Sequence, residues 1–155
     1  MLRIALYQPD IALNVGSAIR LCACMNTGLD IIEPCGFPWD ERKIKRSAMD
    51  YIPHTNLARH TSWHKFLDQY QGKQRIVLLS TKADAAYTDF AFKENDILLM
   101  GRESAGVPDD VHNSADARVL IPMKGGCRSL NVVNAAAMVL SEAIRQTQAD
   151  KTGGT

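Results

Sequence analysis

The stretch "IPMKGGCRSLNVVNAAAMVL", residues 121–140, combines three local patterns that decide the fold of this chain. An apolar, strand-like segment is followed by the glycine pair Gly125–Gly126 and then by an alanine-rich stretch with helical spacing. Asn131 and Asn134 are three residues apart, which predicts both amides on one face of that helix, and we expect this face to be buried. Buried amides need hydrogen-bond partners, so Asn131 is expected to cap the helix or to hold the neighbouring loop. The plainer alternative is a helix packed on a sheet with one capping asparagine.

Similar apolar runs, each bounded by turn residues, recur through the chain as "RIALY" (3–7), "LDIIEP" (29–34), "RIVLLST" (75–81), "DILLMG" (96–101) and "ARVLIPM" (117–123). Helix-like stretches separate several of them. We expect these helices after an N-cap at Asn14, over 40–49, after a cap at Ser62, after Pro108, and from Ser129–Asn131 to about Gln148. Continuous apolar strands that alternate with helices are typical of a mostly parallel sheet covered on both faces, and therefore of an α/β fold.

Length and composition favour one globular domain. The chain has 155 residues, of which 46% are hydrophobic and 23% charged. We expect a single domain over 1–148, with "ADKTGGT" (149–155) as a frayed tail. No apolar run approaches the ~18–20 residues of a membrane span, and the first residues lack the order of a signal peptide. These features predict a cytoplasmic protein without a membrane partner.

Charge and cysteine spacing narrow the possible ligands. The net charge is +1, so any affinity for nucleic acid must come from a local basic patch. Neither the cysteines nor the four histidines follow the spacing of a zinc site. We therefore expect no metal, and buried, reduced thiols at Cys22, Cys24, Cys35 and Cys127.

Two glycine-containing loops, "GRESAG" (101–106) and "KGGCRS" (124–129), each follow an apolar strand. Neither matches a dinucleotide-binding loop or a P-loop, and each taken alone could be a simple turn. Ligands of open parallel sheets bind outside the carboxyl ends of the strands, so the pair predicts one ligand between the two loops. Arg20 is expected at the same end of the sheet, where it either clamps an oxygen of the ligand or is an ordinary exposed arginine.

The chain resembles a known family in three ordered motifs: "NVGSAIRLCA" (14–23), "LLMGRESAGVP" (98–108) and "LIPMKGGCRSLNVVNAAAMVLSEA" (120–143). These are similar to the motifs of the SPOUT (SpoU-type) RNA methyltransferases. "ALYQPDIALNVGSAIRLCA", "IIEPCGFPWDERKIKRSAMDY" and "STKA" resemble its short, single-domain branch. The resemblance extends from end to end.

The resemblance implies a fold, a reaction and partners. The family fold is an α/β sheet whose C-terminal segment forms a deep trefoil knot, which holds S-adenosylmethionine. The branch is homodimeric, its RNA site uses both subunits, and it methylates the ribose 2'-oxygen of the tRNA wobble nucleotide (position 34, cytidine or modified uridine). The substrates implied are tRNA(Leu) isoacceptors, without DNA. The alternatives are a ribosomal RNA 2'-O-methyltransferase and a non-catalytic RNA-binding or assembly factor of the same fold.

Individual residues follow from the same resemblance. Arg20 would orient the ribose hydroxyl and stabilise its developing charge, because a guanidinium stays protonated and is a poor base; Asn14 would shape the active site. The cosubstrate pocket would comprise Leu79, Thr81, Gly101, Glu103, Ile121, Met123, Ser129, Leu130 and Asn131. Val133 and Ser141 depart from residues common in relatives, which leaves details of dimer packing and RNA docking open.

A basic segment is the expected RNA contact. Arg42, Lys43, Lys45 and Arg46 could follow the phosphates of the RNA, together with Arg59, His60, His64 and Lys65. A solvated helix face explains these charges equally well, since Asp40 and Glu41 adjoin them.

Overall fold

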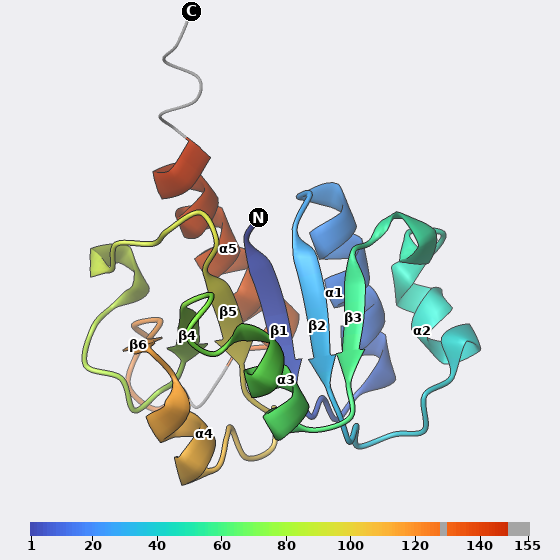
Figure 1. Ribbon diagram of the computed structural model, residues 1–155, viewed down its shortest axis with the longest axis horizontal. Helices are drawn as coiled ribbons and strands as arrows, with labels where there is room; N and C mark the ends of the chain where they lie inside the picture. The colour runs from blue at the N-terminus through green and yellow to red at the C-terminus, as the bar shows by residue number, and fades with distance from the viewer. Residues whose placement is uncertain (128–129, 149–155) are drawn as a thin grey trace, which may run out of the picture.

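The first strand, β1 (Arg3–Tyr7), lies inside a parallel sheet in the computed structural model, which describes residues 1–127 and 130–148 (Figure 1). The strand order of this sheet is β3-β2-β1-β5-β4-β6, and every pair of neighbouring strands is parallel. The predicted α/β fold with a mostly parallel sheet is therefore confirmed. The other strands are β2 (Gly28–Ile32), β3 (Leu57–His60), β4 (Ile76–Leu79), β5 (Ile97–Met100) and β6 (Ala117–Val119).

Helices cover both faces of this sheet. One apolar cluster joins the sheet to α1, α2 and α5, and a second joins it to α3 and α4. Figure 1 shows α3 and α4 in front of the sheet and α1 and α5 behind it. The helices are α1 (Ala12–Cys24), α2 (Glu41–Ala48), α3 (Trp63–Tyr70), α4 (Asp109–Ser114) and α5 (Val132–Gln148), with short 3-10 turns η1 (Ile52–His54) and η2 (Tyr87–Asp89).

The alternation of side chains along β1 explains why its sequence is apolar from Ile4 to Tyr7. Ile4 and Leu6 belong to the cluster under α1 and α5, whereas Ala5 and Tyr7 belong to the cluster under α3. The ring of Tyr7 meets Trp63 of α3 edge-on at 6.0 Å between centroids. A strand covered on both faces is apolar at nearly every position, and for this reason the continuous runs identified the strands.

Strand β3 was not predicted from the sequence. It has only four residues, "LARH", and three of them are partly or fully exposed. Short edge strands of this kind carry little periodic signal, because few residues and only one neighbouring strand constrain them. Its position becomes apparent only through its parallel pairing with β2.

The edge strand β3 brings His60 into a buried polar cluster. Asp30 of β2 is fully buried and accepts hydrogen bonds from Arg3 Nε, from His60 Nε2 at 2.7 Å and from the Tyr70 hydroxyl at 2.8 Å. Burial, together with the neighbouring carboxylate of Asp30, raises the pKa of Tyr70 to about 12, so that its hydroxyl keeps the proton it donates. The expectation that His60 contacts phosphate is wrong, because its side chain is 5% exposed.

Helix starts agree with the sequence in most places. The Ser62 hydroxyl accepts from the backbone N–H of Lys65 at 3.1 Å, which confirms the predicted cap of α3. Pro108 directly precedes α4. At α5, the Asn131 side chain accepts from the backbone N–H groups of Val133 and Asn134 at 2.9 and 3.3 Å, as expected of a cap.

Two expectations about asparagines are wrong. Helix α1 begins at Ala12 with Ile11 before it, so Asn14 lies inside the first turn and is not an N-cap. Asn131 and Asn134 are both exposed in the protomer and do not lie on a buried face. Small side chains do bring α5 close to the sheet, since Ala135 and Ala136 are buried.

The contact between α1 and α2 depends on Gly16. A Cβ added at this residue would overlap with the Ser47 hydroxyl and the carbonyl oxygen of Ile44. Gly16→Ala is therefore expected to lower the free energy of unfolding by about 1–3 kcal/mol through overpacking. Urea unfolding monitored by circular dichroism measures this. Gly125→Ala, at a glycine with open space around it, is the control and should leave the urea midpoint unchanged; equal midpoints for both variants would contradict the prediction.

Some predictions reach beyond the described residues. The expected tail, 149–155, lies outside them, and the domain boundary and the trefoil knot stay predictions. Within the described part of the chain, no helix is long and apolar enough to cross a membrane.

Candidate functional site

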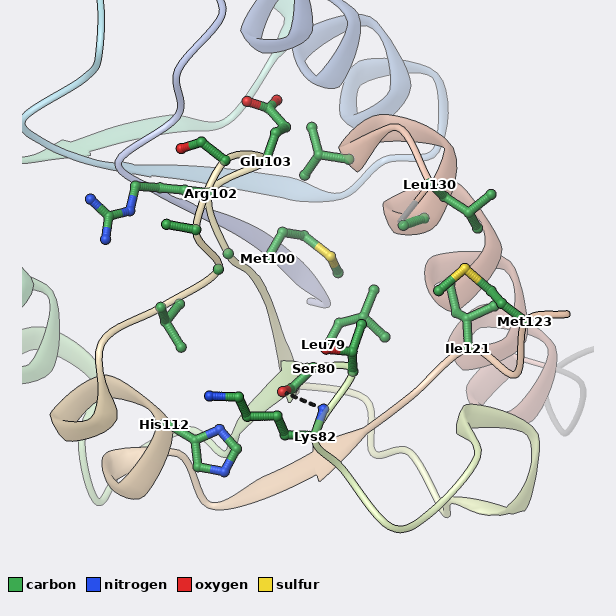
Figure 2. Close-up of a pocket in the computed structure, with 18 of the residues that line it drawn as sticks. Leu79, Ser80, Lys82, Met100, Arg102, Glu103, His112, Ile121, Met123 and Leu130 are labelled. Carbon is green, nitrogen blue, oxygen red and sulfur yellow. Dashed lines mark hydrogen bonds between the residues drawn. The ribbon is translucent and has the colours of Figure 1, made fainter. Parts of the chain in front are cut away.

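A cavity of about 500 Å³ opens at the carboxyl edge of the sheet (Figure 2). Three segments build it: the loop after β4, the loop after β5 with the start of α4, and the chain between β6 and α5. Because neighbouring parallel strands end at the same edge, segments far apart in the sequence meet there. The volume falls within the ~300–1,000 Å³ typical of small-molecule sites.

Most of the predicted pocket residues lie in this cavity. Those that line it are Leu79, Thr81, Gly101, Glu103, Ile121, Met123 and Leu130. Asn131 is not in the lining, and Ser129 lies outside the described residues. Every residue of the "GRESAG" loop borders the cavity, whereas the second loop contributes through its flanks, Met123 and Leu130. Their binding role stays a prediction.

Arg102, Ser104, Ala105 and Gly106 also line the cavity, as members of the predicted "GRESAG" loop, but sequence reasoning missed the rest of the lining: Ser80, Lys82, Met100, Val107, Asp109, His112, Val132 and Ala135. Several directly follow β4 or β5, and that position is a signal that could have identified them. His112 carries no such signal, because only the packing of α4 brings it to the pocket. Figure 2 shows Lys82 and His112 together, across the pocket from Leu130. The Ser80 hydroxyl accepts from the backbone N–H of Lys82 at 3.1 Å and so shapes this turn.

The loop after β5 is closed tightly by two glycines. Arg102 and Gly106 exchange backbone hydrogen bonds of 2.9 and 2.8 Å. A Cβ on Gly101 would lie 2.9 Å from the Gly106 backbone, and Gly106 itself has a φ of +64°. Both positions therefore require glycine. Asp10 ties this loop to the one after β1 by accepting from the Ser104 hydroxyl at 2.8 Å.

Asn14, Glu103 and Asn131 join the three sequence motifs. The Asn14 amide donates to Glu103 Oε1 at 2.5 Å, and the Asn131 amide donates to Asn14 Oδ1 at 3.2 Å. An amide side chain suits this place because it donates to a carboxylate and accepts from a second amide at once. The network explains why an asparagine precedes α5: Asn131 caps the helix and also donates a hydrogen bond to Asn14.

Two buried polar atoms at the pocket have no hydrogen-bond partner within residues 1–127 and 130–148: Glu103 Oε2 and Arg102 Nε. The Arg102 guanidinium lies 5.6 Å from the centroid of the Tyr7 ring, and burial raises the pKa of the Tyr7 hydroxyl. Buried polar atoms without partners are uncommon in native proteins. Because both atoms are buried, a ligand in the cavity would reach them only after a shift of the surrounding side chains.

Arg20 does not reach this pocket within one protomer. Its side chain is exposed on α1, does not line the cavity, and makes no hydrogen bond or ion pair with the described part of the chain. Asn14 is six residues earlier, so Arg20 lies about 9 Å further along the helix axis and about 240° around it. The protomer alone therefore separates the two predicted catalytic residues.

The predicted basic patch lies on the surface of α2. Arg42, Lys43, Lys45 and Arg46 are all exposed, and Asp40 caps the helix by accepting from the Arg42 backbone N–H at 2.9 Å. Arg59, His64 and Lys65 are exposed as well. This exposure leaves the cations accessible to a polyanion, and RNA contact stays a prediction.

The cysteines are free, but they are not all buried. Cys22 is buried, and burial raises the pKa of its thiol to about 12. Cys35 is half-buried, whereas Cys24 and Cys127 are exposed, so the expectation of buried thiols is wrong for these two. Across residues 1–127 and 130–148, no three His, Cys, Asp or Glu side chains form a potential metal-binding group.

Comparison with known proteins agrees with this geometry. The model of the SpoU rRNA Methylase family matches residues 1–141. A tRNA (cytidine(34)-2'-O)-methyltransferase from Beijerinckia indica is 57% identical over 147 residues, covering 94% of this chain and 92% of that protein.

Two solved structures are similar as well. One, described as "Structural insights into the 2-OH methylation of C/U34 on tRNA", superposes with a TM-score of 0.89 at 38% identity and covers 94% of this chain and 95% of its own. The second is the SpoU methyltransferase AviRb from Streptomyces viridochromogenes, in complex with the cofactor AdoMet. It superposes with a TM-score of 0.85 at 28% identity, and the match covers 94% of this chain and 60% of that one. With its motifs joined at one cavity and its family matched over most of its length, this chain belongs to the SpoU methylase family of RNA methyltransferases.

Proposed function

We propose that this protein uses S-adenosylmethionine to methylate the ribose 2'-oxygen of the wobble nucleotide of tRNA. The observation that carries the proposal is the Asn14–Glu103–Asn131 network, which holds the three motifs around one cavity. The similar proteins named for this reaction match nearly the whole chain, which supports the same substrate here.

The cavity suits S-adenosylmethionine in size and in chemistry. Apolar side chains such as Leu79, Ile121 and Leu130 would surround an adenine ring, and the glycine loop after β5 permits close approach of backbone groups. When bound, S-adenosylmethionine supplies a methyl group already activated on a sulfonium.

Because the methyl group is already activated, the tasks left to the protein are alignment and removal of a proton. Asn14 holds the Glu103 carboxylate in one orientation through the 2.5 Å hydrogen bond. Arg20 orients the ribose oxygen and stabilises its negative charge as the proton leaves, since a guanidinium stays protonated.

Arg20 performs this task on the pocket of a second copy of the chain. It shares the exposed face of α1 with Leu13, which is 52% exposed, and Met138 on the outer face of neighbouring α5 is 39% exposed. A homodimer formed over these two helices would cover apolar side chains and carry Arg20 toward the partner. The position of Arg20 away from its own pocket supports this arrangement.

The deep trefoil knot is part of the same proposal. The segment between β6 and α5 returns from the edge of the sheet to its centre, where α5 packs against β5 and α1. This return path, together with the family match, supports threading of the C-terminal segment through the preceding loops.

Basic residues of α2 would contact the RNA backbone. Replacing Lys43 and Arg46 together with glutamine is expected to weaken tRNA binding and to reduce the slope of log affinity against log salt by about 1.5, because fewer counterions are released. Titrations at several salt concentrations measure this. The matched control replaces Lys73 and Lys93, which are exposed near the amino ends of β4 and β5. If the two double variants have the same slope as the wild type, the α2 cations form only a solvated helix face.

One experiment tests the reaction, the substrate and the position together. The protein is incubated with labelled S-adenosylmethionine and total tRNA, and the nucleosides are mapped. Label on the 2'-oxygen of the wobble nucleotide, strongest in tRNA(Leu) isoacceptors, is the expected result in this cytoplasmic enzyme. Parallel incubation with ribosomal RNA provides the competing substrate. Label confined to ribosomal RNA, or RNA binding without any transfer, would instead favour one of the two alternatives.

A further inference from the structure

Arg59, at the carboxyl end of the edge strand β3, is stacked on Trp39. Its guanidinium carbon lies 4.0 Å from the centroid of the indole ring, and its Nη2 donates to Glu33 Oε1. The Arg59 side chain is nevertheless 42% exposed. The indole lies against one face of the guanidinium and the carboxylate binds its edge, and we infer that the exposed part includes the other face.

The loop that carries Trp39 is linked to the pocket loop through Asp10 and leads directly into the basic helix. The loop that carries Trp39 is held by Gly36, whose backbone N–H donates to Pro9 at 2.9 Å. A Cβ on Gly36 would lie 3.0 Å from Asp10, the residue that binds Ser104 of the pocket loop. Trp39 also directly precedes Asp40, the cap of α2. The loop that carries the stack is therefore connected to the pocket loop on one side and to α2 on the other.

Charge pairing at Arg59 favours a planar ligand over a phosphate. Glu33 partly neutralises the guanidinium, which weakens its attraction for a phosphate but leaves its flat outer face open. Unpaired bases of RNA stack on arginine planes and on aromatic rings. A guanidinium held in advance by an indole and a carboxylate loses little conformational freedom when a base stacks on it.

We propose that the Arg59–Trp39 stack is a platform for one unpaired base of the RNA substrate. The inference rests on the proposed function in requiring RNA as the substrate, and it assigns to Arg59 a contact with a base where the sequence predicts one with phosphate. The base stacks on the outer face of the guanidinium, opposite the indole, and helps to place the neighbouring ribose at the pocket.

The substitution Arg59→Lys removes the planar guanidinium but keeps the positive charge, so it tests the two properties separately. The variant is expected to bind an anticodon stem-loop RNA about fivefold more weakly or worse, the lower end of the range for loss of base stacking. The salt dependence should stay that of the wild type, because the positive charge remains. Arg75→Lys is the matched control: Arg75 lies 4.8 Å from the ring centroid of Phe90 and pairs with Asp96, but it directly precedes β4, at the amino end of a strand distant from β3. Its RNA affinity should equal that of the wild type.

The outcomes distinguish this inference from the proposed function. Wild-type affinity in Arg59→Lys would overturn the platform while leaving wobble methylation intact. If Arg59→Gln reduces the salt dependence of RNA binding while Arg59→Lys binds RNA with wild-type affinity and salt dependence, Arg59 contacts a phosphate and not a base. Failure of the wild type to bind any RNA would overturn both. Thermal midpoints within a few degrees of the wild type show that the variants are folded.

Tryptophan fluorescence gives a second, direct measurement. The chain has two tryptophans, so Trp63→Phe leaves Trp39 as the single emitter. Saturating stem-loop RNA should quench Trp39, and an abasic nucleotide at one loop position should abolish the quenching. The same abasic RNA should bind wild type and Arg59→Lys equally, since the stacking partner is missing from both. Unchanged Trp39 emission at saturating RNA would overturn the platform.

Discussion

Replacing Arg20 with alanine is expected to raise the barrier of methyl transfer by roughly 2–4 kcal/mol, or to slow it by about 30- to 10³-fold, while S-adenosylmethionine still binds. The reason is that Arg20 contributes charge stabilisation at the ribose oxygen but does not line the cavity. Single-turnover transfer measures the loss, and calorimetric titration measures binding of the methyl donor. Turnover near that of the wild type would remove Arg20 from the mechanism.

Mixed dimers test whether Arg20 serves the pocket of the partner. Gly101→Val is designed to disable the pocket, because a side chain there would meet the Gly106 backbone. If Arg20 acts across a two-fold dimer, a mixed dimer of Arg20→Ala and Gly101→Val contains one complete site. Equal mixing should then restore about a quarter of wild-type activity from two inactive proteins. No recovery after verified subunit exchange would place Arg20 at the pocket of its own protomer.

Replacing Asp30 with alanine is expected to lower the free energy of unfolding by about 3–5 kcal/mol, which makes it the largest stability effect of the changes considered. Asp30 is fully buried and accepts from Arg3, His60 and Tyr70, which come from β1, β3 and α3. Removing its carboxylate leaves the guanidinium of Arg3 buried and unpaired and two further donors without an acceptor. Most small domains have only ~5–15 kcal/mol of stability in total.

Chemical denaturation of Asp30→Ala, with circular dichroism as the signal, measures this loss. Asp68→Ala on the exposed side of α3 is the matched control, and it should change the unfolding free energy by less than about 0.5 kcal/mol. Asp30→Asn keeps the shape and one acceptor, so an intermediate loss is expected. A loss below about 1 kcal/mol in Asp30→Ala would show that the cluster is not a main source of stability, contrary to the usual cost of breaking a buried ion pair.

The pocket was predictable from the sequence in outline. Gly101 and Glu103 follow a strongly apolar strand, and parallel strands present such positions at one edge of the sheet. His112 was not predictable, because its place depends on how α4 packs. The expectation that Asn14 caps α1 was wrong for a related reason: its local context suits a helix cap, but its side chain donates instead to Glu103, 89 residues away.

The sequence by itself determined the elements whose signals are local. The strands β1, β2, β4 and β5 are covered on both faces, and their sequences are therefore mostly apolar runs. Ser62 and Asn131 identified helix starts, because their side chains accept hydrogen bonds from nearby backbone N–H groups. Only the tertiary structure decided the strand order β3-β2-β1-β5-β4-β6, the edge strand β3 and the burial of His60. The physical reason is that these depend on which distant segments pack together, and that choice is made by the summed burial and pairing of the whole core, which no short window of residues contains.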